Sequence, residues 1–431
     1  EIGSGLVGSE MCIRDRDFTM EGYNKKVIMS YWTICRMKTT KKIYVKVSII
    51  FLLGGILLFS SCEKEENQKI EANRKTLFMY LPWSSNLTNY FYNNISDLEK
   101  CITKIGLNNE KVIVFISTGS TEAMMFEIVS SHGRCKREIL KKYKSPPFTT
   151  IDGITAILND VKAFAPASVY TMIIGCHGMG WLPVYEMKVR SAPHMKMHWE
   201  YQGVPLTRYF GGLTAEYQTD IKSLASGIAN AGMKMEYILF DDCYMSSIEV
   251  AYELKDVTKY LIGSTSEMMA YGMPYAAIGE YLLGNPDYQS GCEEFYNFYS
   301  TYEIMPCGTL AVTDCSELEN MAAIIKSINS KYSFDKSLRG TIQRLDGYTP
   351  VIFYDFADYI TSLCNDPILL NQFREQLNHL VPYKTHTKNF YTMAKGIIPI
   401  NTFSGITTSD PSDNPMTVLK ENTLWYKAAH N

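Results

Sequence analysis

The chain has 431 residues, of which 46% are hydrophobic and 20% charged, as expected for a folded globular protein rather than a disordered one. The net charge is −3, and residues 1–62 hold nine Lys/Arg against five Asp/Glu, which leaves −7 for the remainder. Because that remainder has no basic stripe for phosphate contacts, we expect no nucleic-acid partner. The 11 cysteines are dispersed and include no C-x-x-C pair, so neither a small disulfide framework nor a metal site is predicted.

The N-terminal part has the features of a targeting segment. Lysines within 38–46 precede the apolar run 47–59, which is short for a membrane span and typical of a signal-peptide core. Two serines and Cys62 follow, and this resembles a bacterial lipobox, so 37–61 is predicted to be a signal peptide and Cys62 to be lipidated; an uncleaved membrane anchor is the alternative. The acidic stretch 63–66 resembles the export signal of surface lipoproteins in Bacteroidetes, which predicts an outer-membrane, surface-exposed location.

Residues 1–36 do not fit in front of such a signal. Met37 is a natural start, and residues 7–16 resemble translated sequencing adapter. We therefore expect 1–36 to be non-native, 62–74 to be a polar linker and 75–431 to form the folded domain.

The remaining chain alternates apolar strands with amphipathic helices. One long segment, 181–218, interrupts this pattern; proline and glycine are frequent there, and no helix or strand is predicted. The alternation predicts a mostly parallel sheet with helices on both faces. In chain order the expected elements are strand 76–81, helix 86–105, strand 112–116, a hairpin of 123–129 with 137–143, helix 151–164, strand 169–175, helix 219–231, strand 237–240, helix 248–254, strands 260–263 and 309–313, helix 316–328 and two helices within 350–382.

Two of these strands end in residues that carry chemistry. His177 and Gly178 follow strand 169–175, and Cys243 follows strand 237–240. Parallel strands end on one edge of a sheet, where ligands bind, so the histidine and the cysteine are expected in one cleft. A thiolate can attack and an imidazole can transfer a proton, while the Gly178 N–H is placed to stabilise an oxyanion.

Each residue also has a structural alternative. A lone cysteine is more often buried and inert, a lone histidine is more often hydrogen-bonded structure, and Cys176 is expected to pack in the core. The N-terminus of the helix predicted at 248–254 lies near Cys243 and would favour the thiolate, whereas Asp241 and Asp242 would oppose it. These acids are expected to receive a cationic substrate group or, alternatively, to stabilise a helix N-terminus.

The two motifs together, IIGCHGMGW and ILFDDCYMSSIEVAYELKD, resemble those of the clostripain family of cysteine peptidases, in the caspase–gingipain–legumain group. The resemblance extends from Thr76 to the C-terminal WYKAAH and covers nearly the whole predicted domain. The matching residues are His177, Gly178, Gly180, Trp181, Asp241, Cys243, Met245 and Glu249.

The resemblance implies a caspase-like three-layer α/β/α sandwich with additional C-terminal helices and strands. It implies an endopeptidase with Cys243 as nucleophile and His177 as general acid, and with the amides of Gly178 and Cys243 as oxyanion donors. Family members cleave after Arg or Lys, and Asp241 matches one acid of their specificity pocket. Several relatives have a second acid where this chain has Ala270 and Tyr271, which leaves basic specificity in question.

Family members also cut themselves between the two motifs. The basic loop 181–218 fits this pattern, with Lys188, Arg190 and Lys196 as candidate cut sites, and an ordinary exposed loop is the alternative. Calcium dependence occurs in the family, although this chain has no EF-hand-like spacing of ligands.

The leading hypothesis is therefore a lipid-anchored cysteine endopeptidase that acts on peptides or proteins. An inactive clostripain-like surface protein that binds peptides or a partner is the second hypothesis, and acyl or peptidyl transfer by the same two residues is the third. The sequence predicts no particular oligomeric state.

Overall fold

The computed structural model describes residues 73–184, 203–208 and 217–431, which belong to one compact unit, 71–431. The predicted leader, signal peptide and lipidation site Cys62 lie outside the described residues. So do the candidate cut sites Lys188, Arg190 and Lys196.

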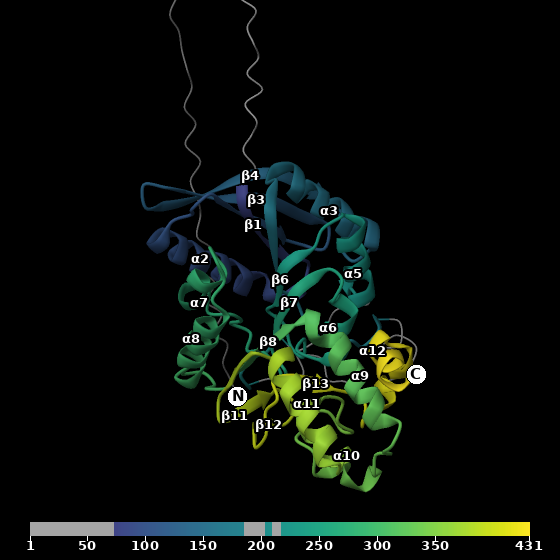
Figure 1. The fold of residues 1–431 in the computed structure, drawn as a ribbon. Coiled ribbons are helices and arrows are strands. Elements are labelled where there is room, and N and C mark those ends of the chain that lie inside the picture. The colour runs from purple at the N-terminus through teal and green to yellow at the C-terminus, as the bar shows by residue number, and fades with distance from the viewer. Residues whose placement is uncertain (1–72, 185–202, 209–216) are drawn as a thin grey trace, which may run out of the picture. The chain divides into compact units, whose positions relative to one another are not determined.

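Nine strands of the described residues form one sheet, in the order β10-β8-β7-β6-β5-β1-β2-β3-β4 (Figure 1). Neighbouring strands from β7 to β2 are parallel, whereas β3, β4 and β8 run antiparallel to their neighbours. The prediction of a mostly parallel sheet is thus confirmed. The strands are β1 (Asn73–Leu81), β2 (Glu110–Ser117), β3 (Glu122–Ser131), β4 (Arg134–Lys144), β5 (Ala167–Ile174), β6 (Met235–Phe240), β7 (Thr258–Gly263), β8 (Thr309–Asp314) and β10 (Tyr383–His386).

Helices cover both faces of this sheet. Figure 1 shows α2, α7 and α8 on one side and α3, α5 and α6 on the other, and helices within each group contact one another. This is the expected three-layer sandwich. The helices are α2 (Thr88–Ile105), α3 (Ile151–Phe164), α5 (Ile221–Asn230), α6 (Ile248–Leu254), α7 (Tyr275–Leu282), α8 (Tyr288–Ser300), α9 (Leu318–Asn329), α10 (Phe356–Leu363), α11 (Pro367–Leu380) and α12 (Leu424–His430).

The apolar runs of the central strands explain their position. Residues 237–240 of β6 are all buried, as a strand covered on both faces requires. In the register of β5 with β6, Ile174 lies opposite Phe240. The residues that follow these two strands therefore begin side by side at one edge of the sheet, as predicted.

The resemblance implied additional C-terminal helices and strands, but the sequence did not locate several elements of the second half of the chain. They are the short strands β9 (Tyr354–Asp355), β11 (Asn389–Thr392), β12 (Gly396–Pro399) and β13 (Thr407–Thr408), together with helices α7, α8 and α12. Trp425 of α12 is fully buried, and its ring contacts Tyr252 of α6 and Phe356 of α10, with centroid separations of 5.8 Å in both cases. The end of the chain is thus packed into the core beside the helix that follows Cys243.

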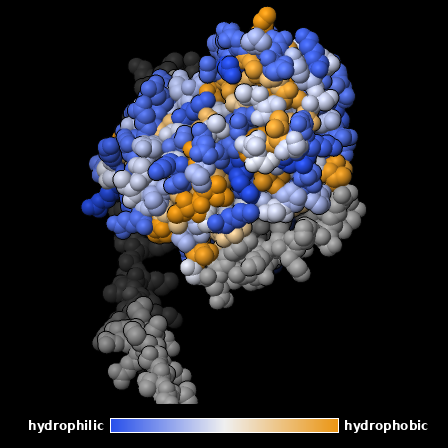
Figure 2. All heavy atoms as spheres, turned by 90° about the horizontal axis from the view of Figure 1, so that it is seen from below, coloured by the Kyte–Doolittle hydropathy of each residue, from blue (hydrophilic) through white to orange (hydrophobic). Residues whose placement is uncertain are grey.

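The outer surface alternates polar and apolar residues. Figure 2 shows one face of the described residues, on which hydrophobic residues form small separate patches among hydrophilic ones. Single exposed side chains such as Ile368 are normal for a protein surface. Within the described ranges, none of the helices is both long enough and apolar enough to cross a membrane.

Candidate active site

The loops after β5 and β6 touch through their backbones. The Asp241 N–H donates to the Ile174 carbonyl at 2.8 Å. A Cβ atom on Gly178 would lie 2.3 Å from the Cys243 carbonyl oxygen and 2.9 Å from the Cys243 nitrogen, so only glycine fits there. His177 and Cys243 are therefore brought to one edge of the sheet, as the spacing predicted.

His177 has a partner that the sequence did not reveal. Its Nε2 lies 2.8 Å from Oδ1 of Asn86, and the ring is buried. Asn86 belongs to a short 3₁₀ turn before α2, in a stretch that was predicted to be plain helix. Because an amide oxygen only accepts hydrogen bonds, this pair assigns the ring proton to Nε2 and fixes the plane of the imidazole.

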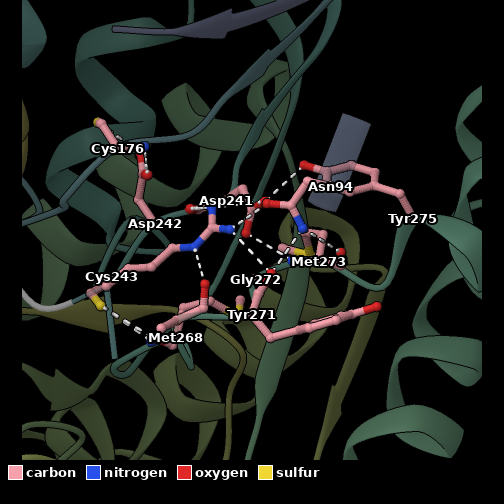
Figure 3. Close-up of polar contacts among 12 residues, drawn as sticks. Asn94, Cys176, Asp241, Asp242, Cys243, Met268, Tyr271, Gly272, Met273 and Tyr275 are labelled. Carbon is pink, nitrogen blue, oxygen red and sulfur yellow. Dashed lines mark hydrogen bonds and ion pairs between the residues drawn. The ribbon is translucent and has the colours of Figure 1, made fainter. Parts of the chain in front are cut away.

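Cys243 is completely buried. Its sulfur accepts a hydrogen bond from the Met268 N–H at 3.2 Å, as Figure 3 shows. Burial raises the pKa of the Cys243 thiol well above its ordinary value, and the carboxylate of Glu267 adds to this effect. The helix predicted at 248–254 is confirmed as α6, which begins at Ile248 and not at Cys243 itself. The thiol is therefore neutral in this arrangement.

Asp242 ties the two loops together. One of its carboxylate oxygens accepts from the Cys176 N–H at 2.5 Å, and the other accepts from the Cys176 thiol at 3.3 Å (Figure 3). Burial raises the pKa of Asp242 to about 7. Cys176 thus contributes a hydrogen bond at the loop, where only core packing was expected.

Asp241 belongs to a buried cluster of polar groups around the Arg208 guanidinium, which we call the arginine pocket. It accepts hydrogen bonds from the Met273 N–H and from the Tyr275 hydroxyl, both at 2.9 Å (Figure 3). Burial raises the pKa of Asp241, whereas the guanidinium of Arg208 lowers it. An Arg208 nitrogen lies 2.8 Å from a carboxylate oxygen of Asp241, and both side chains are almost inaccessible to solvent.

The guanidinium of Arg208 fills this pocket. It donates to the carbonyl oxygens of Asp241 at 2.7 Å, Tyr271 at 3.2 Å and Ala270 at 3.3 Å. The amide oxygen of Asn94 accepts a further hydrogen bond at 2.6 Å. Ala270 and Tyr271 stand where a second acid was sought, and their backbone oxygens contact the cation in its place.

The backbone on either side of Arg208 is paired like a strand. The Arg208 N–H donates to the Met268 carbonyl at 2.7 Å, and the Ala270 N–H donates to the Leu206 carbonyl at 2.9 Å. Thr207 and Met269 form an antiparallel bridge between them. This segment of the loop between the two motifs therefore lies in an extended conformation beside Cys243, whose sulfur contacts the same Met268.

Other motif residues hold the loops in place. Gly180 has φ +61°, and a Cβ atom there would meet the Phe353 ring at 2.8 Å. The Trp181 indole N–H donates to the Ser409 hydroxyl at 2.9 Å, and Glu249 accepts from the Ser409 N–H at 2.7 Å. Trp181 and Glu249 thus fasten both loops to the C-terminal segment and serve the fold rather than the chemistry.

We find no cluster of three or more His, Cys, Asp or Glu side chains suited to hold a metal ion among the residues that the structure describes. Calcium binding, which the family resemblance implied, stays a prediction.

Comparison with known proteins identifies the family. The family model described as "Clostripain family" matches residues 79–398. A secreted C11 cysteine protease from Bacteroides thetaiotaomicron, "iotapain", is 58% identical, with a TM-score of 0.77 over 83% of this chain and 99% of that one. A clostripain from B. thetaiotaomicron ATCC 29148, solved with the peptide inhibitor BTN-VLTK-AOMK, is 65% identical, with a TM-score of 0.50 over 52% of this chain and 99% of that one.

A more distant relative is the inactive zymogen of a C11 protease from Parabacteroides distasonis, which is 25% identical, with a TM-score of 0.68 over 83% of this chain and 98% of that one. No curated protein matches the chain. The family match over most of the described residues and the 58% identity over nearly all of a solved relative lead to one conclusion: the chain belongs to the clostripain family of cysteine peptidases.

Proposed function

We propose that Cys243 and His177 are the catalytic pair of an endopeptidase. The Cys243 sulfur attacks the carbonyl carbon of the cleaved bond, and the N–H groups of Gly178 and Cys243 stabilise the oxyanion. With Nε2 bound to Asn86, Nδ1 of His177 takes the thiol proton as the sulfur attacks and gives it to the leaving amine as the C–N bond breaks. Water then attacks the thioester. His177 takes a proton from this water and passes it to the sulfur as the C–S bond breaks, which releases the acid product and restores the free thiol.

The same proposal gives the enzyme a preference for cleavage after arginine. The supporting observation is the pocket of Asp241, in which the chain's own Arg208 forms an ion pair of 2.8 Å. Four more oxygen atoms, three from backbone carbonyls and one from the Asn94 side chain, accept hydrogen bonds from Arg208. This set of acceptors matches the several N–H groups of a planar guanidinium. A lysine ammonium can reach the same carboxylate, but it has fewer donors for the remaining oxygens.

We further propose that the uncut chain is a closed precursor that cleaves itself after Arg208. This segment occupies the pocket and pairs with Met268 and Ala270 as a bound peptide would in β-strand addition. The inhibitor bound to the 65%-identical relative has the printed sequence VLTK, and the chain's own Leu206, Thr207 and Arg208 correspond to its last three residues, with Arg in place of Lys. In this proposal Arg208 replaces Lys188, Arg190 and Lys196 as the principal cut site.

The single observation that carries the proposal is therefore the ion pair of Arg208 with Asp241, next to the buried Cys243. The test is hydrolysis of fluorogenic peptides that end in Arg, Lys, Leu or Asp before the reporter. We expect the order Arg, then Lys, with no cleavage of the other two, and we expect Cys243→Ala and His177→Ala to be inactive. Equal cleavage of Leu and Arg peptides, or an active Cys243→Ala variant, would contradict it.

One observation favours the inactive protein of the second hypothesis, with any partner bound elsewhere on its surface. Arg208 fills the pocket and Cys243 is completely covered, so a chain that stays uncut cannot admit a substrate. Arg208→Gln decides between the two. If the chain is a peptidase precursor, this variant should remain uncut under conditions in which the unaltered chain is cleaved. An unaltered chain that also stays whole and inactive would favour the inactive protein.

For the location, we propose a lipoprotein of the outer membrane, anchored through Cys62. The support is the signal-like run 47–59 with the lipobox-like residues before Cys62. Cells fed a labelled fatty acid should label the unaltered protein and not a Cys62→Ser variant. Equal labelling of both would contradict the anchor.

A further inference from the structure

A second enclosed site lies next to the arginine pocket. Thr207 and Arg208 are both buried, with Thr207 only 1% exposed, whereas Leu206 and Val204 are 36% and 37% exposed. An added strand gives its affinity through the backbone and its specificity through the side chains that enter pockets. The residue before the cleaved arginine therefore meets protein rather than solvent.

Glu267 forms the wall that faces Thr207. The Thr207 hydroxyl donates to Oε2 of Glu267 at 2.6 Å. The Met393 N–H donates to the same oxygen at 3.0 Å, and the Tyr244 hydroxyl donates to Oε1 at 2.9 Å. Glu267 is 4% exposed, so its carboxylate depends on these donors, one of which comes from the peptide-like segment itself.

The wall is rigid and adjoins the nucleophile. Tyr244 follows Cys243 directly in a left-handed conformation, φ 61°, and its ring stacks on Phe353 at a centroid distance of 4.9 Å. Glu267 precedes Met268, whose N–H contacts the Cys243 sulfur. The carboxylate is thus held at a fixed distance from the bond to be cut, which is the condition for a selective subsite.

We infer that Glu267, together with Tyr244 and the Met393 N–H, forms a subsite that selects threonine as the substrate residue directly before the cleaved arginine. This inference rests on the proposed function. Valine has the same shape as threonine but supplies no donor, so it leaves a buried carboxylate oxygen short of a hydrogen bond. Serine keeps the donor and loses the methyl contact.

A longer side chain at this position would meet the Glu267 carboxylate. The Thr207 oxygen already lies at hydrogen-bond distance from Glu267, and the Met393 sulfur lies 3.5 Å from the Thr207 nitrogen. A lysine at this position would be attracted by the carboxylate, but it has to displace Met393 or Glu267 to enter. We therefore expect selection of a small hydroxyl group and not of a second cation.

The test compares peptides that differ only in the residue before arginine: Thr, Ser, Val or Lys. With the full chain after self-cleavage, we expect kcat/KM to be highest for Thr and roughly 10- to 100-fold lower for Val, the cost of losing one of the two hydrogen bonds to a buried, charged acceptor oxygen. Glu267→Met, which has similar length and no charge, should cleave the Thr and Val peptides equally. It should keep the preference of the unaltered enzyme for Arg over Leu at the cleaved residue. Glu267→Gln retains an acceptor oxygen and should keep part of the threonine preference.

The outcomes separate the two proposals. An enzyme that requires arginine but cleaves the Thr and Val peptides equally, or prefers Lys before arginine, overturns the subsite and leaves the proposed function standing. An enzyme that cleaves no arginine peptide overturns both. In case Glu267→Met does not fold, the chain's own cleavage gives a second measurement: Thr207→Val should slow the loss of intact chain far more than Thr207→Ser, and equal rates contradict the inference.

Discussion

Replacing Asp241 by Asn is the change that most directly perturbs the specificity pocket. The Asp241 carboxylate and the guanidinium that it binds are 2% and 0% exposed, so their ion pair is not weakened by solvent. Loss of one partner of such a buried pair costs about 3–5 kcal/mol, which corresponds to roughly 10²- to 5 × 10³-fold in kcat/KM for an arginine peptide. Asn keeps one oxygen that can accept from Met273 or Tyr275, so the pocket should keep its shape.

The assay pairs each arginine peptide with its citrulline counterpart, which has the same planar shape and no charge. The unaltered enzyme should strongly prefer arginine, and Asp241→Asn should lose most of that preference. Tyr275→Phe is the matched control, because it removes one hydrogen bond to Asp241 and leaves the charge; its preference should change less than about tenfold. If Asp241→Asn retains the full preference for arginine over citrulline, our account of the pocket is wrong.

Two further predictions concern His177 and the buried acids. Asn86→Ala should lower kcat by about 10²-fold with a smaller change in KM, because the imidazole loses the contact that orients it; an unchanged kcat and an unchanged pH profile of kcat would contradict this role. Burial raises the pKa of Glu249 to about 7, above its value in the unfolded chain. Between about pH 4.5 and 7 the folded state therefore binds more protons than the unfolded state, and the free energy of unfolding should fall as pH rises through that range. Glu249→Gln should flatten this part of the dependence of the unfolding free energy on pH, measured by urea denaturation, and an equally steep curve would refute the assignment.

The sequence predicted the fold best where local pattern is strong. Continuous apolar strands such as β6 and the helix α3 were recognised because burial on both faces or on one stripe leaves a regular pattern. Helices α7 and α8 were missed, because their aromatic residues and glycines obscure the helical period. The strand β10 pairs at the sheet edge with β8, far away in sequence, and nothing in its four residues indicates that partner.

The candidate site divides in the same way. His177 and Cys243 could be paired from sequence because each ends a recognisable strand of a parallel sheet. Asn86 lies 91 residues from His177 and carries no local signal of that contact. The sequence also could not show what replaces the second acid of the pocket. The carbonyl oxygens of Ala270 and Tyr271 take its place, and because every residue has a backbone carbonyl, they leave no signal in the sequence.

Identifying where the chain cuts itself tests the central claim most directly. The purified protein and its Cys243→Ala variant are incubated side by side, and intact mass and N-terminal sequencing locate any new ends. Our account predicts a single principal cut between Arg208 and the next residue in the unaltered protein, and no cut in the variant. A principal cut at Lys188, Arg190 or Lys196, or the same cut in Cys243→Ala, would contradict the assignment of Arg208 as the bound cleavage site of a Cys243 peptidase.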